Sequence, residues 1–139
     1  MMIFWNESVL FFIFLLHISE KSINFAAGNK KIANMDKRRT LSRDEALGLV
    51  RRYKQVIAPR FEVEPRVMMF GSYSKGNAGP DSDIDVAVIV PSYGDEKMAL
   101  SKALWRDTRE VSFLIEPVLM ADDRWSPLYS DVMKTGVTV

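Results

Sequence analysis

Two aspartates near the middle of the chain, Asp83 and Asp85, have the spacing and the surroundings of a metal site. The apolar run at residues 83–90 predicts a strand, and residues two apart in a strand project from the same face. Aspartate is uncommon in strands, and ionised carboxylates are rarely buried without a partner. Turn chemistry explains Asp81 and Ser82, but it does not explain Asp85 inside the apolar run. We therefore interpret the pair as ligands for a hard divalent cation.

A glycine–serine pair, Gly71-Ser72, follows another apolar run at residues 67–70, which predicts the preceding strand. Glycine lets the backbone approach a phosphate closely, and the N–H groups after it can form a concavity that binds anions. The Ser72 hydroxyl adds a donor at the same place. Residues 73–75 predict a short helical turn. Lys75 in this turn either contacts phosphate or is an ordinary solvent-exposed lysine.

The pair Gly71-Ser72, ten intervening residues and then Asp83-Ile84-Asp85 resemble the signature of the DNA polymerase beta-like nucleotidyltransferase superfamily. The whole stretch, GSYSKGNAGPDSDIDVAVIV, is most similar to its small stand-alone members, the minimal nucleotidyltransferases. The resemblance extends over roughly residues 41–139. It implies the nucleotidyltransferase fold, an α/β (α+β) domain with a small mixed β-sheet flanked by helices.

The same resemblance implies an activity. A member of this superfamily transfers a nucleoside monophosphate from a nucleoside triphosphate to a hydroxyl group. Here we expect ATP as the substrate and two Mg²⁺ ions as cofactors. Asp83 and Asp85 would be the catalytic metal ligands, and Gly71, Ser72 and Lys75 would bind the triphosphate.

Glu116 is a lone acid in the apolar run at residues 111–120, which predicts a third strand. If this strand lies beside the second, Glu116 points toward Asp83 and Asp85. The family likewise has a third acidic residue on a neighbouring strand, usually an aspartate. We therefore expect Glu116 to be the third catalytic and metal-binding residue and the candidate general base. The alternative is an exposed charge on an edge strand, a position that Pro117 favours because it cannot donate a ladder hydrogen bond.

The elements around this site are expected in the order helix, strand, short helix, strand, helix, strand, helix. Ser42 predicts a capping box at the start of the first helix. Asp95 predicts the cap of a helix that reaches about residue 108. Ser126, followed by proline, predicts the start of the last helix, with Gly136 as its end. The strand at residues 83–90 is apolar on both faces and is expected to be central.

The composition bounds the function classes. The chain has 139 residues, 47% hydrophobic and 27% charged, which suits one domain with a modest core. The net charge is +1, so no nucleic-acid partner is expected. The absence of cysteine excludes disulfides and thiolate zinc sites, and the single histidine, His17, lies far from the motif. Chemistry that depends on a histidine base is therefore not expected.

We divide the chain into an N-terminal extension, residues 1–34, which we expect not to belong to the fold, and a minimal nucleotidyltransferase domain, residues 35–139. The apolar run in the extension is shorter than the roughly 20 residues that a membrane-spanning helix needs. A signal peptide would carry Lys or Arg before this run, where Glu7 stands. We therefore expect a cytoplasmic protein without membrane contact, and a membrane tether is the alternative.

The resemblance also implies partners. Larger relatives carry a further domain that grips the acceptor, so we expect a dimer mate or a separate protein to complete the acceptor site. Stand-alone members are often encoded with a helical HEPN-domain protein, and some are antitoxins that adenylylate a tyrosine of that toxin. We expect the same toxin–antitoxin role here. Two alternatives remain: a catalytically silent module that neutralises its partner by contact, and an antibiotic nucleotidyltransferase subunit that needs a helical partner.

Overall fold

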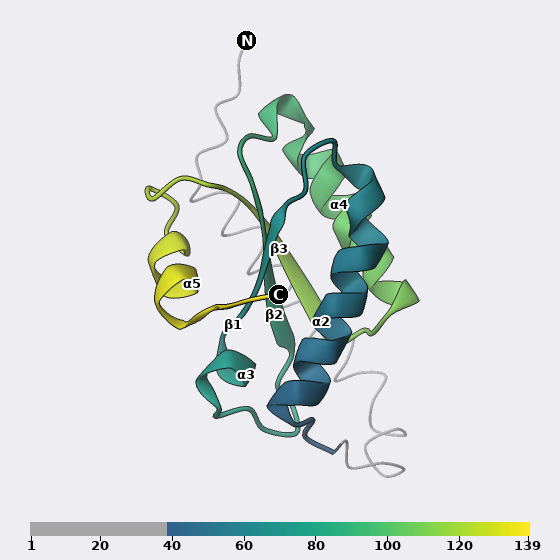
Figure 1. The fold of residues 1–139 in the computed structure, drawn as a ribbon, viewed down its shortest axis with the longest axis vertical. Helices are drawn as coiled ribbons and strands as arrows, with labels where there is room; N and C mark the ends of the chain where they lie inside the picture. Colours follow the sequence, from purple (N-terminus) through teal and green to yellow (C-terminus); the bar gives the residue numbers. More distant parts are fainter. Residues whose placement is uncertain (1–38) are drawn as a thin grey trace, which may run out of the picture. The chain divides into compact units, whose positions relative to one another are not determined.

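The computed structural model describes residues 39–139, and Arg39–Val139 form one compact unit (Figure 1). The extension that we delimited at residues 1–34 lies outside the described residues, so the division of the chain stays a prediction. Within the described part, no helix combines the length and the apolar character needed to cross a bilayer.

Four strands form a mixed sheet in the order β3-β2-β1-β4. The strand β2 (Ile84–Val90) pairs antiparallel with β1 (Arg66–Phe70) and parallel with β3 (Ile115–Ala121). The short β4 (Val137–Thr138) pairs antiparallel with the other edge of β1. The expected small mixed sheet is confirmed, with the second strand in a central position and the third at an edge.

Helices cover both faces of this sheet (Figure 1). On one face lie α2 (Arg43–Ile57) and α4 (Lys97–Asp107), and on the other lies α5 (Tyr129–Thr135). The short α3 (Ser72–Lys75) follows β1 directly. Three 3-10 turns complete the element order: Ala58–Arg60, Gly94–Glu96 and Thr108–Glu110.

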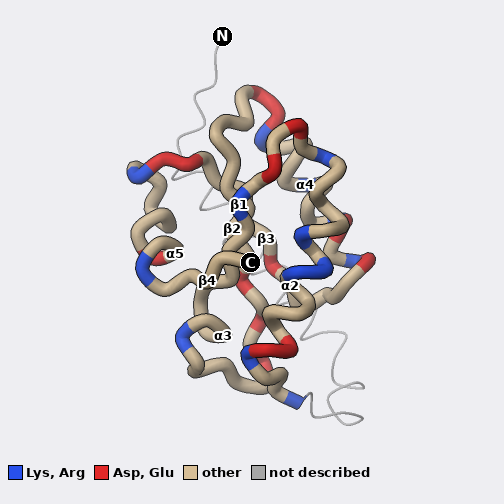
Figure 2. The backbone as a smooth tube through the Cα atoms, in the orientation of Figure 1, with Lys and Arg blue, Asp and Glu red and all other residues tan. Residues whose placement is uncertain are grey.

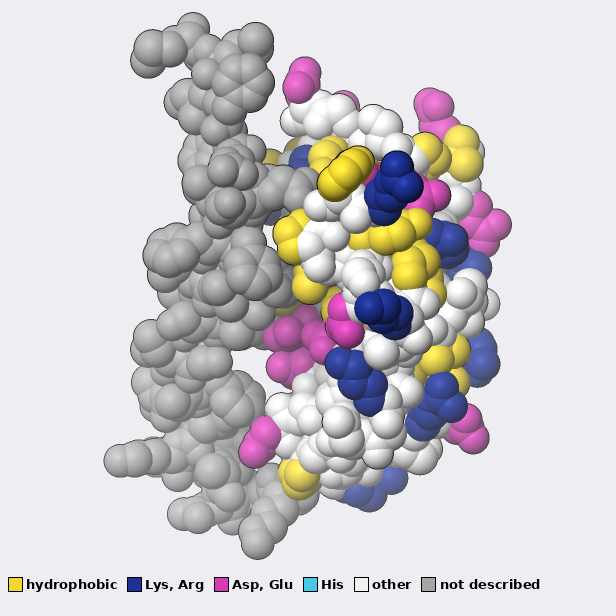
Figure 3. All heavy atoms as spheres, turned by 90° about the vertical axis from the view of Figure 1, so that its left-hand side faces the viewer, with side chains coloured by type: hydrophobic (Ala, Val, Ile, Leu, Met, Phe, Trp, Pro, Cys, Tyr) yellow, Lys and Arg dark blue, Asp and Glu magenta, His cyan; other side chains and the backbone are white. Residues whose placement is uncertain are grey.

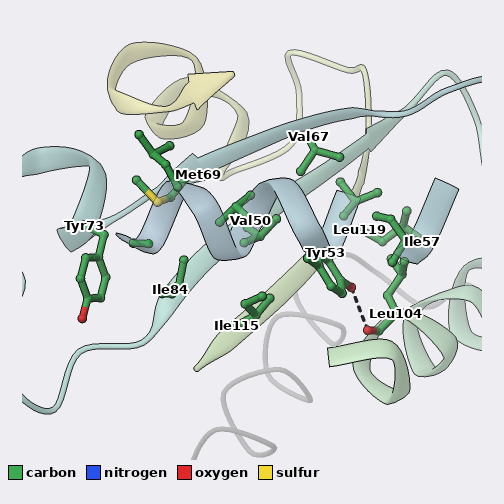
Figure 4. Close-up of a cluster of buried hydrophobic side chains, with 14 of the residues drawn as sticks. Val50, Tyr53, Ile57, Val67, Met69, Tyr73, Ile84, Leu104, Ile115 and Leu119 are labelled. Atoms are coloured by element: carbon green, nitrogen blue, oxygen red, sulfur yellow. Dashed lines mark hydrogen bonds between the residues drawn. The ribbon is translucent and has the colours of Figure 1, made fainter. Parts of the chain in front are cut away.

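Alternate residues of β2 enter two separate cores, as the period of a strand requires. The larger core packs α2 and α4 against one face of the sheet (Figure 4). There, the Tyr53 hydroxyl of α2 donates a hydrogen bond of 2.8 Å to the Leu104 carbonyl of α4. The smaller core lies under α5 and contains Ala87 of β2 and Val132 of α5. Asp85 stands two residues before Ala87, so its side chain projects from the α5 face.

The capping box at the start of α2 is confirmed. The Ser42 hydroxyl accepts from the Glu45 N–H at 3.1 Å, and the Glu45 carboxylate accepts from the Ser42 N–H at 2.7 Å. Gly136 ends α5, as expected. These local signals agreed with the structure because the hydrogen bonds that they describe lie within a few residues.

Two expected helix starts are wrong. Asp95 does not cap a helix: it lies in the 3-10 turn Gly94–Glu96, and α4 begins only at Lys97. The last helix begins at Tyr129 rather than after Ser126, because the residues before it close successive turns. In these turns the Ser126 N–H donates to the Asp123 carbonyl, and the Tyr129 N–H donates to the Ser126 carbonyl.

Two strand assignments also change. The third strand begins at Ile115 rather than at Val111. The N–H groups of Val111 and Ser112, which follow the 3-10 turn Thr108–Glu110, both donate to the Thr108 carbonyl and so continue the turn. The residues after Gly136 form β4, which the sequence analysis missed. Its two residues are too few to show the alternation that marks a strand, and its pairing with β1 is tertiary.

Candidate active site

The candidate site lies where three neighbouring strands meet on the α5 face of the sheet. In the register of the sheet, Asp85 pairs with Phe70 of β1 on one side and with Glu116 of β3 on the other. Paired residues on adjacent strands share a face, so Asp85 and Glu116 project in the same direction. Glu116 is only 7% exposed, and the alternative of an exposed edge charge is therefore wrong.

The carboxylate of Asp85 occupies the space that a side chain at position 71 would need. Gly71 lies between β1 and α3, with φ 76° and ψ −150°, a conformation that favours glycine. A Cβ added at Gly71 would overlap Asp85 Oδ2. The carboxylate therefore lies directly against the Gly71 backbone. Two of the expected site residues, one from each side of the motif, are thus in contact.

The expected helical turn after Gly71 is confirmed as α3, and its own hydrogen bonds and a buried side chain hold it in place. The Ser74 hydroxyl donates to the Gly71 carbonyl at 2.9 Å, and the Lys75 N–H donates to the same carbonyl at 3.1 Å. Tyr73, 3% exposed, anchors the turn in the larger core. The first N–H groups of a helical turn have no partner within it. Ser72, the first residue of α3, directly follows the glycine that Asp85 contacts.

The loop between α3 and β2 closes on itself before the aspartates. The Gly79 N–H donates to the Ser82 hydroxyl at 2.8 Å, and the Ser82 N–H donates to the Gly79 carbonyl at 3.1 Å. Directly after Asp83, the Ile84 N–H donates to the Leu114 carbonyl at 2.7 Å. This bond joins the first residue of β2 to the residue before β3. Together with the turn at Gly79 and Ser82, it holds the backbone on both sides of Asp83.

The electrostatics at Asp85 are unfavourable for an isolated carboxylate. Burial, the nearby carboxylate of Asp83 and the carboxylate of Asp131 raise the pKa of Asp85 to about 6, while the Lys75 ammonium opposes the rise. A cation bound here would relieve both the burial cost and the repulsion. Figure 3 shows the α5 side of the molecule, where acidic and basic side chains lie close together.

Asp131 is a site residue that the sequence analysis missed. Its carboxylate lies 3.5 Å from the Lys75 ammonium, so α5 and α3 meet through opposite charges. Charged positions on α3 and α5 are visible along the backbone in Figure 2. Asp131 belongs to no motif, and no local signal in the sequence relates it to residues in the centre of the chain. Only the packing of α5 on the sheet brings it here.

The donor set suits a metal site that the substrate completes. Across residues 39–139, no group of three or more His, Cys, Asp or Glu side chains is arranged to hold a metal ion. Mg²⁺ is usually bound by one or two carboxylates together with waters and substrate phosphates. Asp83 and Asp85 fit that description. The assignment of Glu116 as a third ligand stays a prediction.

We expect Gly71→Ala to destabilise the protein more than Gly76→Ala. Gly76 lies in the left-handed helical region (φ 77°, ψ 18°), which costs an L-residue about 1–2 kcal/mol, whereas Gly71 (φ 76°, ψ −150°) lies in a region that is essentially restricted to glycine. A Cβ at Gly76 meets nothing within 4 Å, whereas a Cβ at Gly71 meets the Asp85 carboxylate. Overpacking adds about 1–3 kcal/mol at Gly71. Urea unfolding of the two variants measures the difference, and equal losses would contradict both the conformation of Gly71 and its contact with Asp85.

We expect Asp85→Asn to stabilise the metal-free protein in a pH-dependent way. The pKa of Asp85 rises from 3.8 to about 6 in the folded protein, so the folded state binds the proton more tightly than the unfolded state. The cost of the carboxylate is therefore absent below about pH 4, grows between about pH 4 and pH 6 and is complete above that. With about 1.4 kcal/mol for each unit, the gain at pH 7.5 is up to about 3 kcal/mol. Urea unfolding with EDTA at about pH 4 and at pH 7.5 tests this prediction, and a gain in stability that is independent of pH would contradict it.

The chain is similar in sequence to known nucleotidyltransferases. The sequence profile of the nucleotidyltransferase domain family matches residues 50–120. A Methanocaldococcus jannaschii protein named "Putative protein adenylyltransferase" is 26% identical over 98 residues, which are 68% of this chain and 99% of that protein. The crystal structure of a "putative nucleotidyltransferase" from Sulfolobus solfataricus aligns with 72% of this chain and 87% of its own, at 17% identity and a TM-score of 0.48. Because the family profile spans half of the chain and includes the candidate site from Gly71 to Glu116, the protein belongs to the nucleotidyltransferase domain family and is a nucleotidyltransferase.

Proposed function

We propose that this nucleotidyltransferase uses Mg²⁺ and transfers AMP from ATP to a hydroxyl group of a partner protein. The observation that carries the proposal is the contact of Asp85 with Gly71. It places a carboxylate that is destabilised by burial and by Asp83 next to a turn with backbone N–H groups and a hydroxyl. Carboxylates that need a cation and donors that suit a phosphate are the two halves of a site for a metal–triphosphate complex.

In this proposal each residue has a defined task. Asp83 and Asp85 hold the cations, which neutralise the triphosphate and lower the pKa of the attacking hydroxyl. Gly71 and Ser72 hold the outer phosphates. The hydroxyl oxygen of the acceptor forms a bond to the α-phosphorus, and the bond from that phosphorus to the oxygen of the β-phosphate breaks, so pyrophosphate leaves. Glu116, beside Asp85 on β3, accepts the hydroxyl proton as general base.

A protein acceptor has two lines of support. The Methanocaldococcus jannaschii relative, whose name refers to protein adenylylation, is matched over 99% of its length. In addition, Phe113 is 73% exposed and directly precedes Leu114, which bonds to Ile84 at the site end of the sheet. An exposed aromatic ring beside a reaction site suits contact with a large acceptor. The resemblance to the minimal nucleotidyltransferases favours a helical HEPN-domain toxin as that acceptor, modified by this chain as antitoxin. Its use of ATP would place the reaction in the cytoplasm.

A second candidate is a catalytically silent module that neutralises the same partner by contact alone. One observation favours it: within the described residues, the three expected carboxylates do not form a ready-made cage for one ion. The silent module requires no transfer of AMP, whereas the enzyme requires it, so the two proposals differ in a measurable product.

We expect the Asp83→Asn, Asp85→Asn double variant to lose affinity for Mg²⁺·ATP by more than about tenfold, because neither side chain then carries the charge that holds the cation. Asp81→Asn is the matched control, since this acid lies in the same loop and is exposed. It should bind within about twofold of the unmodified protein. Calorimetric titration with Mg²⁺·ATP measures all three proteins. Equal affinity of the double variant and the unmodified protein would refute the metal site.

We expect Glu116→Gln to retain Mg²⁺·ATP binding but to transfer AMP about 10²–10⁴-fold more slowly, which is the usual contribution of a general base. Glutamine keeps the size of the side chain and removes its charge. Glu110→Gln, an exposed acid just before β3, is the control and should transfer at the normal rate. The measurement uses labelled ATP and a HEPN-domain partner. A Glu116→Gln variant that transfers at the normal rate would remove Glu116 from the mechanism, and no transfer by the unmodified protein would favour the silent module.

A further inference from the structure

The ion pair between Lys75 and Asp131 connects two elements that are far apart in the sequence. Lys75 is the last residue of α3, and Asp131 lies in the first turn of α5. Their charged atoms are 3.5 Å apart, and their side chains are 40% and 45% exposed. An ion pair this exposed contributes at most about 1 kcal/mol to folding. The location of the ion pair, near the proposed nucleotide site, is more important than this small contribution to stability.

The pair is close to the Asp85 carboxylate through the backbone of α3. Lys75 belongs to the turn that begins at Gly71, against which Asp85 packs, and its N–H donates to the Gly71 carbonyl. A cation and its counter-ion therefore lie at the edge of the proposed triphosphate site.

Packing holds the backbones of both partners. Val132, next to Asp131, is fully buried in the smaller core, and the Thr135 hydroxyl donates to the Asp131 carbonyl at 2.8 Å. On the other side, the Lys75 N–H is bonded to Gly71, and the buried Tyr73 anchors α3. The packing of α3 and α5 therefore brings the two charges together.

The geometry of the ion pair allows Lys75 to exchange Asp131 for another anion. At 3.5 Å, the charged atoms are farther apart than the 2.7–2.9 Å of a strong charge-assisted hydrogen bond. A triphosphate brings several negative charges at once, and lysine is a common phosphate ligand. Lys75 can therefore leave Asp131 for the triphosphate at little cost.

We propose that Asp131 is a positioning residue of the nucleotide site, which holds Lys75 beside Asp85 in the free protein and releases it to the triphosphate when ATP binds. This inference rests on the proposed function. It adds a residue of α5, outside the 50–120 match to the family profile, to the site. Asp131 acts through Lys75 and needs no contact with the nucleotide.

The test is a double-variant cycle in which Mg²⁺·ATP binding is measured by calorimetry on the full chain. Asp131→Asn should bind about two- to fivefold more tightly, because no exposed ion pair has to be broken. Lys75→Met should bind more weakly. Asp131→Asn introduced into the Lys75→Met protein should change the affinity by less than about 1.5-fold, because the lysine on which it acts is gone. Asp131→Glu should restore normal affinity.

Asp95→Asn is the control for net charge, since this exposed acid lies beyond the other end of β2. It should leave the affinity unchanged. Weaker or unchanged binding by Asp131→Asn would overturn the inference, and so would equal tightening with and without Lys75, which would indicate long-range repulsion alone. If the unmodified protein binds no Mg²⁺·ATP, the proposed function and this inference both fail. If it binds normally and the cycle shows no coupling, the inference alone fails.

Discussion

The carboxylate of Asp85 lies against the backbone of Gly71, and this contact connects the two halves of the site. The register of β1 and β2 places Phe70 opposite Asp85, so the residue after Phe70 must leave the strand without occupying the carboxylate's space. Gly71 does so with a positive φ and no Cβ. The turn that presents Ser72 and the strand that presents Asp85 are thereby held in one arrangement. A change in either one displaces the other.

The site is costly for the free protein, and the larger core offsets this cost. Asp85 is partly buried near two other carboxylates, an arrangement that raises its pKa and disfavours its charged form. On the opposite face of the sheet, α2 and α4 cover fully buried strand residues such as Val86 and Ile115. Burial of such side chains contributes about 1.5–3 kcal/mol each. The two faces of the sheet thus differ in role, one stabilising the fold and the other carrying the charged groups.

The helix α5 contributes both to the stability of the fold and to the charged site. Val132 packs on β1 and β2 in the smaller core, and its neighbour Asp131 reaches Lys75. The end of the helix is equally close to the sheet, because a Cβ at Gly136 would meet both the Val132 carbonyl and the Met68 side chain. Tight packing of this short helix therefore determines where the Asp131 charge lies. In this way the C-terminal part of the chain influences a motif in its centre.

The sequence alone determined the motif and the local elements around it. Gly71-Ser72 and the spacing to Asp83 and Asp85 were sufficient to indicate the family, because this chemistry requires particular residue types within a short stretch. The continuous apolar run of β2 was sufficient to place it in the centre of the sheet, because a strand that is buried on both faces needs neighbours on both sides. The capping box of α2 was equally readable, since its hydrogen bonds span three residues.

The tertiary structure alone decided which distant residues join that motif. Whether Glu116 is buried next to Asp85 or exposed at an edge depended on the parallel pairing of β3 with β2, which no local pattern encodes. The strand β4 exists only because its two residues pair with β1. Asp131 reaches Lys75 because its neighbour Val132 is buried between α5 and the sheet. Nothing in the sequence around either charged residue indicates the other one. Motif spacing reports contacts along the chain, whereas register and helix packing create contacts across it, and these depend on the fold as a whole.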